Sequence, residues 1–276
     1  MKHVITILYI LSVFILAECS TEISKLVGFT KQIDVFGIQI VATETTPDGK
    51  ILHAANVMAE YIDNNEDGIP DNRKVVEALV GRKVTLIMAW DEDELRSINE
   101  KNEPDLLPAG PSPFQSLFAV ETHPDAVSQG IFDGAWEEIL HPITDVGYAN
   151  AYPEVFGVKS GTEVAKVMDR ARGGHFIDVP ERYPGDAWFT YYDKTCGYGC
   201  QIAEYVYWAL TSILGAQDFP GRLERIENEW GLNTAEKVKI KDPYIYALLT
   251  DPRYKFPTVL PDGHYNPKNF KILKYP

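Results

Sequence analysis

Two stretches of the chain gather side chains that bind metal ions or move protons. The first covers residues 63–71 and reads DNNEDGIPD; the second covers residues 136–145 and reads WEEILHPITD. Carboxylate and amide oxygens suit a hard cation such as Ca²⁺, whereas an imidazole beside carboxylates suits Zn²⁺ or another transition metal. The sequence therefore offers two distinct metal chemistries, one on each stretch.

The acidic loop has oxygen ligands at the spacing that a calcium ion requires. Side-chain oxygens stand at loop positions 1, 3 and 5, a glycine at position 6 permits a sharp turn, and position 7 offers a backbone carbonyl. Helical periodicity flanks the loop over residues 52–62 and 75–80. Residues 52–80 resemble the calcium loops of EF-hand and thrombospondin type 3 repeat proteins. A solvated acidic turn is the alternative interpretation.

That resemblance implies which groups would bind Ca²⁺. The ligands would be the side chains of Asp63, Asn65 and Asp67, the carbonyl of Ile69, and Asp71 either directly or through water. A full EF-hand loop has a bidentate glutamate at position 12, where this chain has Lys74. Either Glu77 supplies the missing ligand, or the site has one ligand fewer.

The second stretch places its metal-binding groups on one side of a predicted helix over residues 133–146. Glu137 and His141 are one turn apart, and Asp145 follows at the next turn. An imidazole with carboxylates on one helix face is a competent transition-metal surface. The alternative is a solvent-facing helix in which His141 caps the helix or pairs with Asp145.

Written as E-E-x-x-H, this motif resembles the H-E-x-x-H helix of zincin metallopeptidases, with glutamate in place of the first histidine. The glutamate-zincin branch takes a further ligand from a downstream helix, and Glu204 has that place in a predicted helix over residues 201–214. The resemblance implies metal ligation by Glu137, His141 and Glu204. It also implies a catalytic role for Glu138 as the general base of a metal-dependent hydrolase, which takes a proton from the water that the metal activates.

The chain differs from the zincin pattern close to this motif. Pro142 removes one backbone donor inside the predicted helix. Trp208 stands one turn beyond Glu204, where that pattern has an acid. Aromatic residues are dense on both sides of Cys196; those at helical spacing, such as Tyr205, are expected in the core, and those before Cys196 could line a cleft or hold a carbohydrate.

The N-terminal segment predicts export. Residues 1–19 have a short basic end, an apolar run that is too short to cross a bilayer comfortably, and small residues at its end. We expect a signal peptide that is cleaved before Ser20, and a secreted protein with no membrane span. The alternatives are a lipid anchor on Cys19 and an uncleaved N-terminal anchor.

Two cysteines remain after such cleavage, Cys196 and Cys200. An even number of cysteines in an oxidising compartment favours a disulfide. Its expected role is to fix the start of the helix that carries Glu204. A metal-binding pair and a redox dithiol are the alternatives.

Length, charge and periodicity describe the rest. With 276 residues, 45% hydrophobic residues and a net charge of -14, the chain is globular and suits divalent cations far better than nucleic acid. Strands are predicted at 32–46, with a break at Gly37, at 84–90 and at 114–120, and the Pro-rich segment 91–113 reads as a surface loop. Residues 47–49 read as a turn. Further helices are predicted at 162–171, 221–230 and 244–249, before an irregular tail from residue 251 onward.

These features predict one α+β domain over residues 20–276, with a zincin-like mixed sheet and an EF-hand-like helix-loop-helix near its N-terminus. Its half from residue 130 to residue 250 is mainly helical. The leading hypothesis is a secreted calcium-binding protein of metallopeptidase-like ancestry that also holds a transition metal. The alternative is a non-enzymatic extracellular binding or matrix protein, with a protein or glycan partner and a purely structural calcium site.

Overall fold

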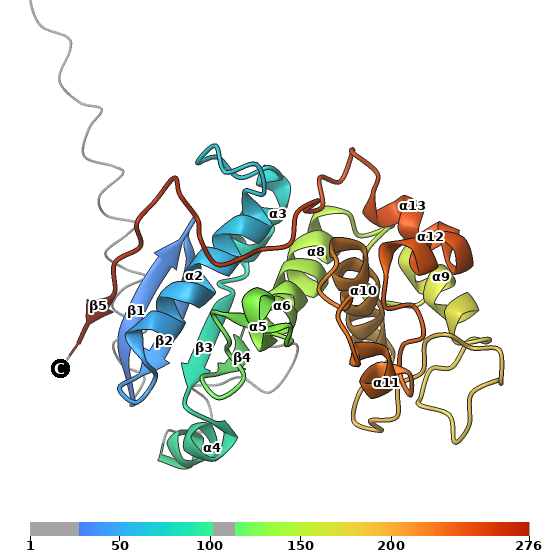
Figure 1. The fold of residues 1–276 in the computed structure, drawn as a ribbon, viewed down its shortest axis with the longest axis horizontal. Coiled ribbons are helices and arrows are strands. Elements are labelled where there is room, and N and C mark those ends of the chain that lie inside the picture. The colour runs from blue at the N-terminus through green and yellow to red at the C-terminus, as the bar shows by residue number, and fades with distance from the viewer. Residues whose placement is uncertain (1–27, 102–113, 276) are drawn as a thin grey trace, which may run out of the picture.

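A five-stranded mixed sheet lies at one side of the molecule, and most of the helices gather at the other (Figure 1). The computed structural model describes residues 28–101 and 114–275, so the predicted signal peptide and Cys19 lie outside the described residues. The strands lie in the order β4, β3, β2, β1, β5. Their bounds are Phe29–Val35 for β1, Ile38–Thr43 for β2, Thr85–Ala89 for β3, Phe114–Phe118 for β4 and Leu273–Lys274 for β5. Strands and helices together confirm the α+β fold class.

All three predicted strand regions form strands. β1 and β2 make an antiparallel hairpin, with Phe36 and Gly37 in the left-handed conformation at its turn (φ of 53° and 90°). This turn is the break that Gly37 predicted, because glycine adopts positive φ without steric cost. β2, β3 and β4 run parallel, and β4 forms one edge of the sheet.

Side chains alternate between two apolar layers along the sheet. Ile40 and Ala42 of β2 pack in the main core with helix α2 (Asp48–Ile62), whereas Val41 belongs to a smaller cluster with Ile98 of helix α4 (Glu92–Lys101). All residues of β2 and β3 are buried. Because successive strand residues point to opposite faces, a strand covered on both faces reads as a continuous apolar run.

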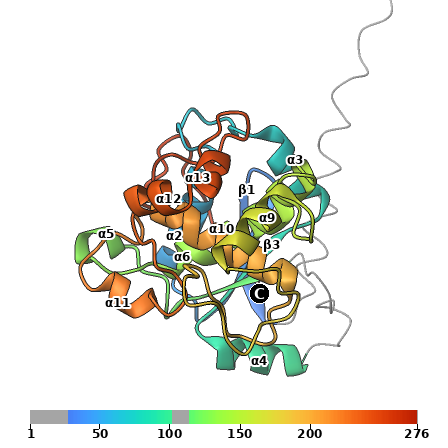
Figure 2. The ribbon, with the colours of Figure 1, turned by 90° about the vertical axis from the view of Figure 1, so that its right-hand side faces the viewer.

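The helical half is built around α10 (Tyr198–Leu214). The helices α9 (Glu163–Ala171), α12 (Ala235–Lys241) and α13 (Pro243–Leu249) pack against one another and around α10 (Figure 2). The others are α3 (Arg73–Gly81), α5 (Ala126–Gln129) and α11 (Arg222–Ile226). The predicted helices at 162–171, 201–214 and 244–249 are confirmed within a few residues.

Two predictions of irregular structure are wrong. The segment predicted as a surface loop begins with α4 (Glu92–Lys101), whose first turn carries three acids that favour the positive end of the helix dipole. Arg96 also pairs with Glu92 and Asp93 one turn earlier (2.9 and 3.0 Å). The turn expected at residues 47–49 is instead the start of α2, which begins at Asp48.

Two helix predictions also need correction. Residues 221–230 were expected to form one helix, but α11 ends at Ile226. A further helix, α12, was not predicted and begins where the side chain of Thr234 accepts the N–H of Lys237.

The predicted helix over residues 133–146 is interrupted. α6 (Gly134–Glu138) and α7 (Leu140–Pro142) lead into a π-helical segment, η1 (Ile143–Tyr148), and then into α8 (Ala149–Ala151). Regular helical bonding cannot pass Pro142, because proline has no N–H and crowds the preceding turn. The hydroxyl of Thr144 donates to the carbonyls of Leu140 and His141 (3.0 and 3.1 Å) at this point. Such π-helical turns occur often at functional sites.

The C-terminal strap, residues 251–275, runs from α13 back across the helices to β5 beside β1 (Figure 1). Its Pro261 carbonyl accepts from the indole of Trp136 in α6 (2.9 Å). Its Gly263 N–H donates to Glu60, and its Gly263 carbonyl accepts from Asn56, both in α2 (3.0 and 2.7 Å). The predicted irregular tail therefore ties α2 to the helix that carries the metal-binding motif.

Replacement of Gly263 by alanine should destabilise the fold by about 1–3 kcal/mol. Gly263 has φ of +81°, and a Cβ there would lie 2.2 Å from Nδ1 of His53. His53 cannot move aside freely, because its Nε2 lies 2.6 Å from Asp133. Gly215→Ala is the matched control, since Gly215 also has positive φ but an open Cβ position. Chemical denaturation should show the larger loss for Gly263→Ala; equal losses would contradict the predicted clash.

Candidate metal centre

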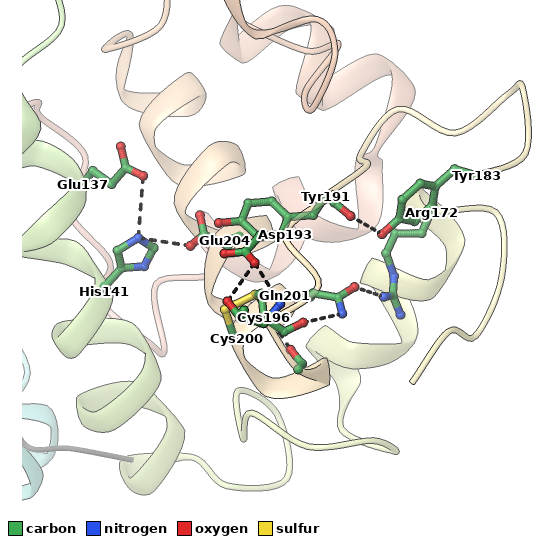
Figure 3. Close-up of a disulfide and its surroundings, with 12 residues drawn as sticks. Glu137, His141, Arg172, Tyr183, Tyr191, Asp193, Cys196, Cys200, Gln201 and Glu204 are labelled. Atoms are coloured by element: carbon green, nitrogen blue, oxygen red, sulfur yellow. Dashed lines mark hydrogen bonds and ion pairs between the residues drawn. A yellow bond between two sulfur atoms is a disulfide. The ribbon is translucent and has the colours of Figure 1, made fainter. Parts of the chain in front are cut away.

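Glu137, His141 and Glu204 come together between α6, α7 and α10 (Figure 3). The Nε2 of His141 lies 3.8 Å from Oε1 of Glu137 and 3.7 Å from Oε1 of Glu204. All three ligand atoms lie within 4.8 Å of one another, and no other group of three such residues is found in the part of the chain that the structure describes. A divalent ion at the centre of this group would meet one nitrogen and two oxygens. That donor set suits a transition metal such as Zn²⁺ and leaves a coordination position open.

The start of α6 is fixed by a buried carboxylate. Asp133 accepts the N–H groups of Ala135 and His123 (3.1 and 2.8 Å) and lies 2.6 Å from Nε2 of His53 in α2. In α2, the hydroxyl of Tyr61 donates to the carbonyl of Trp136 (2.9 Å). These contacts hold the helix immediately before Glu137.

A disulfide and a buried amide fix the start of α10. Cys196 and Cys200 form the predicted disulfide, with Cα atoms 5.3 Å apart. Gln201 donates to the carbonyl of Cys196 (3.0 Å) and accepts from the fully buried Arg172 of the α9 end. Glu204 lies one turn after Cys200 on the same helix, so the disulfide lies close to the metal-binding group (Figure 3).

Burial and mutual attraction control the charges in this group. Burial raises the pKa of Glu204 to about 7, and the neighbouring charge of His141 works in the opposite direction. Burial disfavours the charged form of His141, but the neighbouring carboxylates of Glu137 and Glu204, each within 4 Å, outweigh this and raise its pKa. A metal ion must therefore displace a tightly held proton from His141, so binding should weaken in acid.

Glu138 lies next to this group and contacts the sheet edge. One of its oxygens accepts a hydrogen bond from Gln115 of β4. Burial is the main cause that raises its pKa to about 7; His141 lowers it, and Glu137 and Glu121 raise it. A carboxylate with this pKa takes up and releases a proton near neutral pH, as a general base requires.

Asp145, which the helical spacing placed beside His141, is not part of the metal-binding group. It lies in η1, where π-helical winding turns it away from the stripe expected for a regular α-helix. Its buried Oδ1 has no hydrogen-bond partner among the described residues. Burial raises the pKa of Asp145 to about 6, and His141 acts in the opposite direction.

Sequence reasoning missed three side chains around the group. The phenol of Tyr191, from the loop before the disulfide, lies beside Glu204 (Figure 3) and lowers the pKa of this carboxyl. The ring of Tyr207 lies 5.5 Å from the ring of His141, and the charge of Glu137 acts on its phenol. Gln115 donates to Glu138. The aromatic stretch before Cys196 was the one available signal for Tyr191. Tyr207 stands three residues after Glu204, where a spacing of one helical turn could have indicated it.

The acidic loop is closed by hydrogen bonds to its own carboxylates. Asp63 accepts the N–H groups of Asp67 and Gly68 (3.2 and 2.8 Å), and Asp71 accepts from the side chain of Asn65 (3.0 Å). Asp67 accepts the N–H of Ile69 (2.9 Å). Gly68 has φ of +86°, as the sharp turn at position 6 requires. Asp63 is buried, whereas Asn65 and Asp67 are exposed. Among the described residues, the carboxylates of Asp63, Asp67 and Asp71 do not converge as closely as those of the metal-binding group.

The C-terminal strap also holds this loop. Tyr265 donates to Asp63 (2.5 Å), and the side chain of Asn64 bonds with the backbone of Val259 in both directions (2.9 Å each). Glu77 remains on the exposed face of α3, 3.9 Å from Arg73. Of the two alternatives left by Lys74 at position 12, the structure has the one in which Glu77 does not enter the loop.

No protein-family model, curated protein or solved structure matches this chain. The resemblances to zincins and to EF-hand loops therefore remain predictions from the residues that carry them. None of the described helices is long and apolar enough to cross a membrane.

Replacement of Asp145 by asparagine should stabilise the fold at neutral pH by on the order of 1–2 kcal/mol. The pKa of Asp145 is raised from 3.8 to about 6 in the folded state, so the folded state binds this proton more tightly than the unfolded state does. Its contribution to stability is therefore favourable below about pH 4 and is lost as pH rises to about 6. The stability that Asp145→Asn gains over the wild type should therefore be absent below about pH 4, rise between about pH 4 and 6, and be full above about pH 6.

Denaturation of both proteins from pH 4 to pH 8, in chelator, measures this difference. Asp125→Asn serves as the control, because Asp125 is exposed and its change should be small at every pH. A stability difference for Asp145→Asn that does not vary with pH would contradict the predicted titration.

Proposed function

We propose that this chain is a metal-binding protein that works as a metal-dependent hydrolase, with calcium in a structural role. The observation that supports it most directly is the convergence of Glu137, His141 and Glu204 from α6, α7 and α10, with Glu138 beside them. Burying two carboxylates and an imidazole together is costly unless something compensates their charge and desolvation. A bound cation is the compensation that this donor set fits best.

The roles follow from position. Glu137, His141 and Glu204 would hold the metal, which supplies Lewis acidity to a substrate carbonyl and to water. Glu138 would accept a proton at its carboxylate, because its raised pKa leaves it partly ionised near pH 7. Tyr191, whose phenol lies beside Glu204, would keep this carboxylate oriented, and Gln115 would hold Glu138 against the edge strand.

The calcium and export predictions form the second part of the proposal. The ligands would be Asp63, Asn65, Asp67, Asp71 and the carbonyl of Ile69. A loop that already turns at Gly68 and is held by the strap has little more entropy to lose on binding. The disulfide is compatible with an oxidising, extracellular location, where millimolar calcium would fill even a weak site.

Substitution of His141 by alanine should remove about one equivalent of transition metal from the purified protein, because it deletes the only nitrogen of the group. Elemental analysis measures this loss directly.

Glu138→Gln should keep the metal and lower hydrolysis of a casein or peptide mixture by about 10²–10⁴-fold, as expected for loss of a general base. His123→Ala is the control, since His123 lies outside the group.

Each half of this experiment can fail separately. A wild-type protein without transition metal, after loading and removal of excess ion, would overturn the metal centre. Full metal occupancy with no hydrolysis that depends on Glu138 would overturn only the enzymatic part.

Substitution of Asp67 by alanine should remove most of the stabilisation that calcium provides. A site with ligand at 10–100 times its dissociation constant stabilises the fold by roughly 1.4–2.7 kcal/mol. Thermal unfolding in calcium and in chelator should therefore show a smaller difference for Asp67→Ala than for the wild type. Asp125→Ala removes the same charge from an exposed position outside the loop and should leave the calcium effect unchanged. An equal stabilisation by calcium in all three proteins would contradict calcium binding by this loop.

A second candidate is a non-enzymatic extracellular protein in which the transition metal is structural. The burial of the group favours it, since His141 is 8% exposed and the side chain of Glu204 is 14% exposed. Structural metal sites are typically closed to solvent. For this candidate, His141→Ala would lower stability, whereas Glu138→Gln would have no functional consequence.

A further inference from the structure

A chain of hydrogen bonds behind Glu137 has only one consistent set of donors and acceptors. It starts at Arg222 of α11, whose Nε donates to Oε1 of Gln217 (2.6 Å). A guanidinium can only donate, so the amide of Gln217 must turn its oxygen toward Arg222. Its Nε2 therefore points the other way, toward α10.

The Nε2 of Gln217 has two acceptors on α10. It donates to Oγ1 of Thr211 (3.0 Å) and to the hydroxyl oxygen of Tyr207 (3.4 Å). The proton of Thr211 is already used within the helix, because its hydroxyl donates to the carbonyl of Tyr207 (2.7 Å). The phenolic oxygen of Tyr207 thus accepts from Gln217, and its own proton remains free to donate elsewhere.

Glu137 is the carboxylate beside that phenol. Burial and then the charge of Glu137 raise the pKa of Tyr207. The ring of Tyr207 lies 5.5 Å from the ring of His141, whose Nε2 is 3.8 Å from Glu137. Tyr207, Thr211 and Gln217 are fully buried, so bulk water does not compete for these bonds. The guanidinium of Arg222 lies 4.2 Å over the ring of Phe132, which fixes the outer end of the chain.

We propose that Tyr207 is a positioning residue of the metal centre, oriented by Gln217 and Arg222 so that its phenol donates to Glu137 and holds this carboxylate toward His141 and Glu204. One oxygen of a ligating carboxylate binds the metal, and the other needs a fixed hydrogen-bond donor. Without that donor the carboxylate could rotate away from the metal. The inference rests on the proposed metal site. It adds which side chains make Glu137 a competent ligand.

The first test is the zinc affinity of Tyr207→Phe, measured by competition with a chromophoric chelator. We expect Zn²⁺ to bind about 10–100-fold more weakly, the usual effect of removing a partner that orients a ligand. Tyr205→Phe is the matched control. Tyr205 is equally buried on the same helix, but its hydroxyl donates to Asp242 (2.5 Å) rather than to the metal-binding group, so zinc affinity should not change.

The second test is Gln217→Glu, which keeps the size of the side chain and can still accept from Arg222. A carboxylate has no donor, so the phenol of Tyr207 would donate to position 217 and leave Glu137. We expect zinc affinity to fall about as much as in Tyr207→Phe. A purely structural role for Tyr207 would not predict this loss in a variant that retains the phenol. Circular dichroism without metal checks that each variant is folded. Where Tyr207→Phe does not fold, the zinc affinity of Gln217→Glu is the deciding measurement.

The outcomes separate the inference from the function on which it rests. Wild-type affinity in both variants, with stoichiometric zinc in the wild type, would overturn the role of Tyr207 and leave the metal centre intact. A wild-type protein that binds no zinc would overturn both. Weaker binding in Tyr207→Phe and Gln217→Glu, but not in Tyr205→Phe, would support the hydrogen-bond chain.

Discussion

The arrangement of this molecule depends on the burial of charge between α6, α7 and α10. Three glutamates and a histidine lie close together where water is largely excluded, and the raised pKa values of Glu138 and Glu204 show the cost of ionising them there. Such a cluster is stable only when its geometry is held and its charges are compensated. The surrounding contacts supply the first requirement, and a cation would supply the second.

The sheet and the strap both hold the elements around this cluster. The edge strand β4 contributes Gln115 to Glu138, while α2 fixes the start of α6 through His53 and Tyr61. The strap bonds α6 through Pro261 and the acidic loop through Tyr265. The two predicted metal sites thus lie at separate places in the fold but share one restraint, the C-terminal segment. Order gained in the loop should therefore also limit motion of the helix that carries Glu137.

Sequence reasoning succeeded where the determining contacts are local. The spacing of Glu137 and His141 puts both on one helix turn, and apolar runs identified β3 and β4. Of the predicted surface loop at 91–113, residues 102–113 lie outside the described residues, and residues 92–101 were misread. The stability of α4 comes from acids at its first turn, among them Glu94, which accepts from Thr43 and the N–H of Trp90 (3.1 and 2.6 Å). Polar composition alone cannot distinguish such a helix from a loop. The displacement of Asp145 likewise results from a π-helical turn, which regular periodicity does not include.

The side chains that surround the cluster could not be predicted from the sequence for a different reason. Glu204 was inferred from the zincin pattern, whereas Gln115 and Tyr191 reach the site from other segments of the chain, and no local period records that proximity. Two departures from the zincin pattern can nevertheless be understood as one change. A histidine ligand needs an acceptor behind its free N–H, which an acid provides, but a glutamate ligand needs a donor. For the proposed ligand Glu137, an acid one turn beyond Glu204 would repel the carboxylate. The chain instead has Trp208 there and, at Tyr207, the phenol that we propose as its donor.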